Sequence, residues 1–463
     1  KALEEKQLKI ADSIDKGFIN FRYYVFDSEK YRKPVLNEKT PTVNLPTSKS
    51  NLAITGSVKY PLTGLQGPFK YDNRLSLNSV TTTLIIDPLQ RTATVMEANV
   101  TDLFENHKFV ASLTNFLDLN SNRFALEYQY LPHRLDFRTK YYRNNYYYTS
   151  ADGSATERYI LSRVDATVAY PFGTASSVSF SPQYMRTKYI KVFDGRQANL
   201  AAPDILQNYV GYRFEYNFDN TIGKGLNMLE GMRIRVKLEN NTHISNKKLT
   251  FNNLSIDFRR YQKIHKELVF AVRGSYGRFF GNAAKRYLVG GMDNWFFASS
   301  KVTSRSDDPL SDAAGFGDQG RTNRLFNQYV TNLRGFDYNT LYGKSYMLYN
   351  FELRFPIVRY LYKGPIESNF LKHFQLNFFY DIGTAWDSGN PFNGNNSVNT
   401  RIVDTDPSYR ITIRNFDDPF VRSFGLGFRT MMLGYYTKFD VAQGIQNGVY
   451  VRPMLHITLG SDF

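Results

Sequence analysis

The chain has 463 residues, a formal net charge of +16, no cysteine, and many tyrosine (34) and phenylalanine (37) residues. Without cysteine, it can build neither a disulfide scaffold nor a thiolate metal site. The mean hydropathy of −0.43 excludes a bundle of membrane-spanning helices, because each helix needs about 20 mostly apolar residues. The basic charge does not indicate nucleic-acid binding, because Lys and Arg alternate with apolar residues along strands instead of clustering on a helix or loop.

The first 85 residues differ from the rest of the chain. Residues 1–16 are highly charged, and their aliphatic residues have the spacing of a short amphipathic helix. Residues 17–85 combine aromatic patches with polar, turn-rich stretches and show no regular period. We expect residues 1–85 to form a linker or adaptor that lies against another component. The chain begins with Lys1 and carries no apolar signal-peptide core, so for an exported protein we expect a mature or trimmed product.

From about residue 90 the chain shows the period of β-strands. One hairpin has its turn near Glu105-Asn106, and the stretches FALEYQYLP and RLDFRTKYYRNNYYYT predict the next two strands. The clearest strand is 232–239, in which apolar and charged residues alternate strictly. On a helix these charges would surround the whole circumference, whereas on a strand they share one face. This alternation is typical of a barrel strand with one face toward lipid and one toward a wet lumen.

The end of the chain repeats this pattern. Its apolar residues share one face of a terminal strand that is interrupted by a glycine: Leu455, Ile457, Leu459 and Phe463, with Gly460. Counting such segments forward gives about sixteen strands, an even number as in single-chain bacterial barrels. The sequence therefore predicts an all-β fold, a transmembrane antiparallel β-barrel of about 16 strands over residues 86–463. The polar stretch 282–343 is too long for a turn and predicts a long extracellular loop.

One group of residues carries a more specific signal. The tripeptide Arg334-Gly335-Phe336 lies in the long loop and is followed by the stretches FELRFP and FYDIG. Strand alternation places Glu352 of the first stretch, and Asp381 with Gly383 of the second, on the lumen face. An arginine between two inward carboxylates would form charge-assisted, two-pronged hydrogen bonds. The small Gly335 allows a tight reversal of the chain at the loop tip.

These motifs resemble the outer-membrane surface-antigen superfamily, which includes the central subunit of the β-barrel assembly machinery and two-partner secretion pores. The segments SFGLGFR, YYTKFDVA and the terminal strand match as well, so the resemblance covers roughly residues 90–463. It implies that the long loop folds into the lumen, where Arg334 is held by Asp381 and a second acid, for which Glu352 is the candidate.

The resemblance also implies a weak seam between the first and last strands, with client strands pairing to the exposed edge. We expect the first strand near residues 91–103 and the last strand at Leu455 to Phe463. Pro453 removes one backbone donor just before this last strand, and Gly460 interrupts it. Both features are compatible with a weak seam.

The implied function is insertion of outer-membrane proteins, or polypeptide translocation across the outer membrane of a Gram-negative bacterium, without bond-making catalysis. Family members usually carry periplasmic POTRA modules, and residues 1–85 contain no recognisable one. The chain is more similar to the C-terminal barrel of Bacteroidetes proteins that fuse a propeller to a barrel, so we expect residues 1–85 to be periplasmic. The alternative is a non-catalytic structural or accessory subunit of a larger cell-envelope complex. A passive porin is disfavoured, because an inserted loop narrows the lumen.

The expected partners are outer-membrane lipids, lipopolysaccharide, and other envelope proteins or client polypeptides, and no nucleic acid. We expect no cofactor or metal, because the six histidines are too far apart for a local metal motif. The acid pairs Asp307-Asp308 and Asp417-Asp418 are read as solvated loop tips, although carboxylates can bind calcium. Gly290-Gly291 is read as a strand bend.

Overall fold

The computed structural model describes residues 74–88, 91–149, 156–193, 203–298, 324–392, 400–406, 409–414, 418–460 and 462. The chain divides into two units, residues 1–70 and 71–463. The first unit, with the expected amphipathic helix, lies outside the described residues, as do both acid pairs in part or whole and the expected terminal Phe463.

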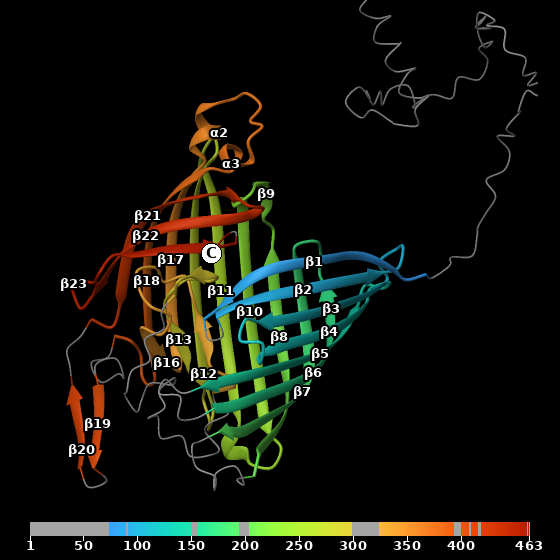
Figure 1. Ribbon diagram of the computed structural model, residues 1–463, viewed down its shortest axis with the longest axis vertical. Helices are drawn as coiled ribbons and strands as arrows, with labels where there is room; N and C mark the ends of the chain where they lie inside the picture. The colour runs from blue at the N-terminus through green and yellow to red at the C-terminus, as the bar shows by residue number, and fades with distance from the viewer. Residues whose placement is uncertain are drawn as a thin grey trace, which may run out of the picture. The chain divides into compact units, whose positions relative to one another are not determined.

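The described residues are mostly β-strand (Figure 1). Sixteen strands form the wall of a barrel: Ser76–Asp87 (β1), Arg91–Thr101 (β2), His107–Phe116 (β3), Asn122–Tyr130 (β4), Asp136–Thr149 (β5), Thr156–Pro171 (β6), Ser176–Phe193 (β7), Ile205–Asp219 (β8), Met228–His243 (β10), Phe251–His265 (β11), Leu268–Phe280 (β12), Ser345–Phe355 (β17), Gln375–Trp386 (β18), Val421–Met432 (β21), Tyr435–Gln446 (β22) and Met454–Leu459 (β24).

The remaining elements are short: Ile222–Gly225 (β9), Tyr287–Val289 (β13), Trp295–Phe296 (β14), Gln328–Val330 (β15), Leu341–Gly343 (β16), Thr400–Asp406 (β19), Tyr409–Arg414 (β20), Val449–Tyr450 (β23), and the helices Lys247–Leu249 (η3), Ile357–Leu361 (α2) and Asn369–Lys372 (α3). In the described part of the chain, no helix is long and apolar enough to cross a membrane.

Each wall strand pairs antiparallel with the next wall strand along the chain, from β1 to β24. The strand β14 adds a short seventeenth strand on the free edge of β24. This arrangement confirms the predicted antiparallel barrel of about 16 strands. The hairpin of β19 and β20 forms a separate two-stranded sheet between β18 and β21 in the sequence.

The two faces of the wall follow the predicted alternation. In β18, Asp381 is fully buried inside while its neighbours Phe378 and Tyr380 are 51% and 38% exposed on the outside. In β10, the inward Arg235 pairs with Glu215 of β8 at 3.0 Å. The outer face carries many exposed large apolar side chains, which is expected of a surface that contacts lipid.

The first strand differs from the prediction. The sheet begins with β1 at Ser76, before the expected boundary at residue 86, and the expected first strand near 91–103 is the second strand, β2. The sequence SLNSVTTTLIID is polar on both faces over most of its length, and both faces are largely exposed. An edge strand pairs on one side only and packs little, so it shows no apolar alternation for a sequence pattern to detect.

The long loop between β12 and β17 folds into the barrel and builds its core. Within it, β13 pairs parallel with β15 and antiparallel with β16. Loop residues Leu333 and Phe336 are buried in one cluster with inward wall residues such as Tyr209 and Leu348. We call residues 281–298 and 324–344 the lumen loop.

Candidate lumen site and barrel seam

The tip of the lumen loop places the Arg334 side chain between two wall carboxylates. Its Nε and Nη2 atoms each donate to a different oxygen of Asp381 at 2.7 Å, and its Nη1 donates to Glu352 at 2.7 Å. The guanidinium also lies 3.7 Å from the ring centroid of Phe379. Arg334 is 1% exposed. Two-pronged pairing with a buried carboxylate fixes the orientation of the guanidinium plane as well as its position.

Glu352 joins Arg334 to two further buried arginines. Arg354 donates to Glu352 at 2.8 Å, and Arg429 donates to both oxygens of Glu352 at 2.7 and 3.2 Å. A third acid, Asp440, lies 3.8 Å from Arg334 Nη1. Burying a charge is costly unless opposite charges surround it, and here the acids and bases alternate in space. We call these residues, together with Asp381, the Arg334 cluster.

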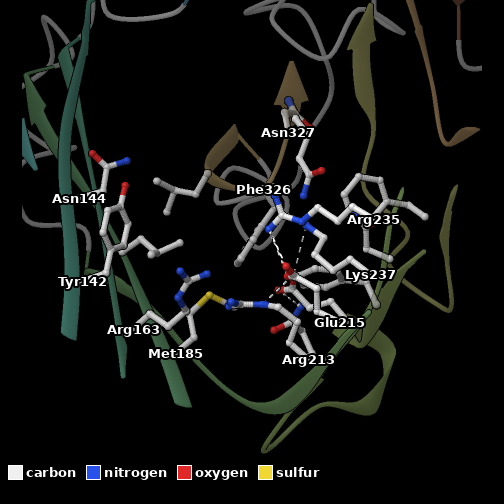
Figure 2. Close-up of a pocket in the computed structure, with 18 residues that line it drawn as sticks. Tyr142, Asn144, Arg163, Met185, Arg213, Glu215, Arg235, Lys237, Phe326 and Asn327 are labelled. Carbon is white, nitrogen blue, oxygen red and sulfur yellow. Dashed lines mark hydrogen bonds and ion pairs between the residues drawn. The ribbon is translucent and has the colours of Figure 1, made fainter. Parts of the chain in front are cut away.

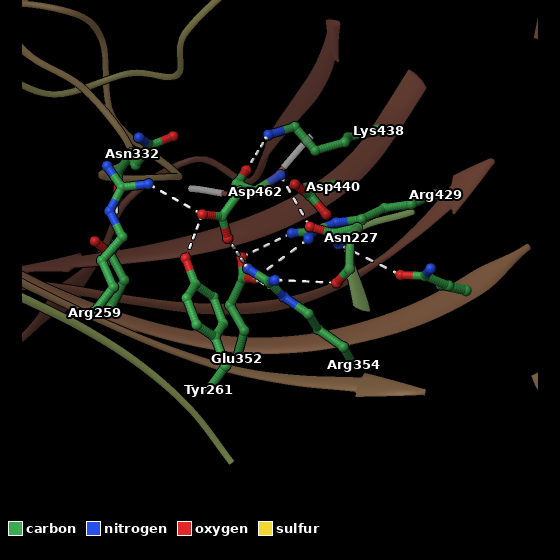
Figure 3. Close-up of polar contacts among 12 residues, drawn as sticks. Asn227, Arg259, Tyr261, Asn332, Glu352, Arg354, Arg429, Lys438, Asp440 and Asp462 are labelled. Atoms are coloured by element: carbon green, nitrogen blue, oxygen red, sulfur yellow. Dashed lines mark hydrogen bonds and ion pairs between the residues drawn. The ribbon is translucent and has the colours of Figure 1, made fainter. Parts of the chain in front are cut away.

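The end of the chain enters the same interior. The chain leaves the wall at Gly460 (φ 116°), and Asp462 accepts hydrogen bonds from Arg354 at 2.9 Å, from Arg259 at 3.0 Å and from the Tyr261 hydroxyl. Figure 3 shows these side chains converging on Asp462. In addition, the Asp462 carbonyl accepts from Lys438 at 2.9 Å. The last strand is therefore fixed at its end by ionic contacts inside the barrel.

Glycines let the loop tip approach the wall closely. Gly335 has φ 79°, and a Cβ there would meet the Gly444 backbone nitrogen at 3.1 Å. Gly383 leaves room for Leu333, since a Cβ at Gly383 would lie 2.9 Å from a Leu333 methyl. Phe336 is buried in the loop core beside Gly444. The predicted residues of the tip thus fit as one packed unit.

Gly290 has a role that a strand bend does not describe. Its φ is 142°, and a Cβ at Gly290 would lie 1.9 Å from the carbonyl oxygen of Asp337. The following Gly291 forms a bridge with Leu333. This glycine pair therefore allows direct backbone contact between β13 and the turn that carries Arg334.

The wall is interrupted between β1 and β24, and we call this gap the seam. No ladder joins β1 to β24 among the residues that the structure describes. Instead, Asn294 of the lumen loop spans the gap. Its Oδ1 accepts from the Ile86 backbone nitrogen of β1 at 3.0 Å, and its Nδ2 donates to the Leu459 carbonyl of β24 at 3.3 Å. Of the predicted terminal-strand residues, Leu455 and Ile457 face outward and Leu459 pairs with the loop.

His456 of β24 connects the seam to the loop tip. Its Nε2 accepts from the Gly335 backbone nitrogen at 2.8 Å, and its ring lies 4.3 Å from that of Trp295 in β14. His456 is fully buried. One side chain of the last strand therefore contacts both the tip and β14.

The sequence prediction missed several of these residues. Arg354, Asp440, His456 and Asp462 lie outside the predicted site, although each stands on an inward position of a predicted strand or its end. Alternation alone would have placed them in the lumen. It could not show that Glu352 and Asp462, far apart in sequence, meet on Arg354.

A cavity of about 330 Å³ lies between the lumen loop and the wall. Figure 2 shows Phe326 of the loop with the inward Arg163 on one side of it and the inward Arg235 and Lys237 on the other. Arg235 pairs with Glu215 at 3.0 Å, so much of this charge is neutralised within the wall. The cavity is a polar space that the loop narrows.

Comparisons with known proteins agree with this architecture. The model of the Omp85 superfamily domain matches residues 106–445. No curated protein sequence matches the chain. Similar solved structures include BamA from Haemophilus ducreyi lacking POTRA domains 1-3, at 13% identity and a TM-score of 0.55, covering 84% of this chain and 71% of that one. Another is CdiB from Acinetobacter baumannii, at 11% identity and a TM-score of 0.42, covering 83% of this chain and 58% of that one.

The BamA likeness shows a shared fold, and the family match extends over most of the barrel, including Arg334, Glu352 and Asp381. The chain belongs to the Omp85 superfamily and is an outer-membrane β-barrel of a Gram-negative bacterium.

Proposed function

We propose that this chain inserts barrel proteins into the outer membrane, or passes polypeptides across it, by means of the seam. The observation that carries this proposal is the missing ladder between β1 and β24 among the described residues. A strand edge without a ladder partner offers backbone donors and acceptors to another extended chain. A barrel closed on all sides would offer no such edge.

The second candidate is a structural or accessory barrel within a larger envelope complex. It is supported by the Arg334 cluster, which fixes the lumen loop with buried charges, and by Asp462, which anchors the end of the last strand. The chain covers 71% of the BamA structure and 58% of the CdiB structure.

Reconstitution separates the two candidates. Vesicles with and without the purified chain receive a urea-unfolded outer-membrane barrel as client, and folding is followed by gel mobility before and after heating. Insertion function predicts faster client folding with the chain present. A rate equal to that of empty vesicles, together with stable copurification of other envelope proteins from membranes, would favour the structural subunit.

Single-channel conductance tests the porin alternative. Because the lumen loop fills the barrel and the cavity beside it holds only about 330 Å³, we expect small or no steady conductance. A large, stable open-channel current would contradict both proposed functions and support a porin.

A further inference from the structure

We propose that β14 is an internal strand that occupies the free edge of β24, and that this segment must withdraw before an incoming strand can pair there. This inference rests on the proposed function, because it concerns how the seam becomes available. The occupant of the edge in the closed barrel is Asn294 to Phe296 of the chain itself, and the partner that replaces it is an extended polypeptide strand.

The pairing of β14 continues the wall beyond β24. Trp295 lies opposite Thr458 and Phe296 opposite Ile457, in antiparallel register. Trp295 points inward and is 3% exposed, whereas Phe296 is partly exposed on the side of Ile457. The segment therefore follows the same inward and outward alternation as a wall strand. An incoming strand would use the same backbone atoms of β24, so the two cannot bind together.

The segment is held by few contacts, which favours withdrawal. It pairs over two residues, whereas β22 pairs with the other edge of β24 over six. Left-handed residues border it on both sides, Asn294 (φ 50°) and Phe297 (φ 61°). Asparagine tolerates this conformation, but a bulky phenylalanine rarely adopts it, and Phe297 is 90% exposed. A short strand with a strained border is easier to displace than the rest of the wall.

The contacts of β14 also specify what replaces it. The inward position opposite Thr458 holds a large aromatic ring that lies against His456. The outward position holds an aromatic residue beside Ile457 on the lipid side. An extended strand with aromatic residues at two successive positions reproduces both contacts, so we expect such a strand to compete best.

A disulfide between β14 and β24 tests whether withdrawal is required. The chain has no cysteine, so an introduced pair is the sole thiol pair. Phe296→Cys with Ile457→Cys joins directly opposite residues, whose Cα atoms are about 5.5 Å or less apart, within the range of a disulfide. The control is Val441→Cys with Leu455→Cys, which joins the same strand to β22 on the same outer face.

The oxidised 296–457 pair should reduce client folding in reconstituted vesicles at least tenfold, with recovery after reduction. The oxidised control pair should retain the rate of the reduced protein. Full activity of the oxidised 296–457 pair would overturn the inference. Equal loss in both oxidised pairs would also overturn it, because the whole last strand, and not β14 alone, would then have to move.

A second readout does not depend on activity. The chain has two tryptophans, so Trp386→Phe leaves Trp295 as the sole tryptophan. The probe is a synthetic peptide with the sequence of residues 291–298 in which phenylalanine replaces tryptophan. Acrylamide quenching of Trp295 should rise several-fold when the peptide is added to the reduced 296–457 protein, and stay low in the oxidised protein.

An equal rise in the oxidised protein, or full quenching without peptide, would overturn the inference. If the peptide exposes Trp295 only in the reduced protein while no variant folds a client, the proposed insertion function is refuted and the proposal of an internal strand is supported. If clients fold at full rate with the disulfide formed, the insertion function is supported and the proposal of an internal strand is refuted.

Discussion

Replacing Arg334 with alanine should release the lumen loop without unfolding the barrel. The substitution removes three side-chain hydrogen bonds of 2.7 Å, two of them to Asp381, which is fully buried. Glu352 keeps its contacts with two other arginines, so the uncompensated charge falls on Asp381, which keeps the side-chain hydrogen bond from Asn350. Breaking a buried ion pair in this way costs about 3–5 kcal/mol.

This cost predicts the size of the effect on hydrogen exchange. Each 1.4 kcal/mol corresponds to a factor of ten, so local opening around the tip should become about 100-fold to a few thousand-fold more frequent. Amide exchange in the peptide that covers Leu333 to Phe336, measured by mass spectrometry in detergent micelles, should accelerate accordingly. Peptides from β3 and β4 should change little, because these strands contribute no residue to the Arg334 cluster or to the buried cluster that holds Leu333 and Phe336.

Three further variants make this prediction specific. Arg334→Lys should recover only part of the protection, since an ammonium cannot make the planar two-pronged contact with Asp381. The double variant with Asp381→Asn should be less perturbed than the sum of its single changes, because it removes both charges of the pair. Arg422→Ala removes an arginine that pairs with Asp418 at 2.6 Å on the surface, and should cost about 0–1 kcal/mol. A change below tenfold for Arg334→Ala, or an equal change for Arg422→Ala, would refute the reasoning.

Three other predictions concern the seam and the end of the chain. Asn294→Gly keeps the left-handed backbone but removes the two side-chain hydrogen bonds across the seam. Because each of these bonds contributes about 0.5–1.5 kcal/mol, quencher access to Trp295 should rise about tenfold. Asp462→Asn should lower the temperature at which heating changes the gel mobility of the barrel. Burial raises the pKa of Asp462, but Arg354, the Tyr261 hydroxyl and Arg259 lower it more, to about 2. This stabilisation is present above the unfolded pKa of about 3.9 and is lost only as the pH falls toward about 2. Titration of Asp462 should therefore leave the temperature of the gel-mobility change unaltered between about pH 7 and pH 5. Gly290→Ala should disrupt the lumen loop and make the protein more sensitive to protease. The control is Gly173→Ala, where a Cβ meets no neighbour within 4 Å, and this variant should be cleaved less.

Strand alternation explains why much of the barrel could be predicted from sequence. A wall strand has one face in lipid and one in the lumen, so each inward charge is flanked by outward apolar residues. This pattern placed Glu352 and Asp381 inside, and both are buried there. Predicting the Arg334 contacts also required the resemblance to a known family, because strand alternation does not indicate where an arginine of a loop will lie.

The elements that escaped prediction carry no such pattern. The first strand, β1, packs little on either face, so selection for apolar alternation is weak there. The strand β14 is two residues long and exists only because Thr458 and Ile457, far away in sequence, present a free edge. Its left-handed borders at Asn294 and Phe297 depend on that tertiary contact, and no local propensity indicates them.

The two sets of contacts made by the lumen loop differ in strength, and this difference orders the steps of opening. The Arg334 cluster holds the loop tip with buried, charge-assisted hydrogen bonds, whereas β14 holds the seam with a two-residue pairing beside a strained phenylalanine. The weaker contact should release first. Because His456 touches both Gly335 and Trp295, departure of β14 removes one neighbour of this ring while the tip still supports it from the other side. The last strand can therefore lose its internal partner and remain positioned to accept another strand.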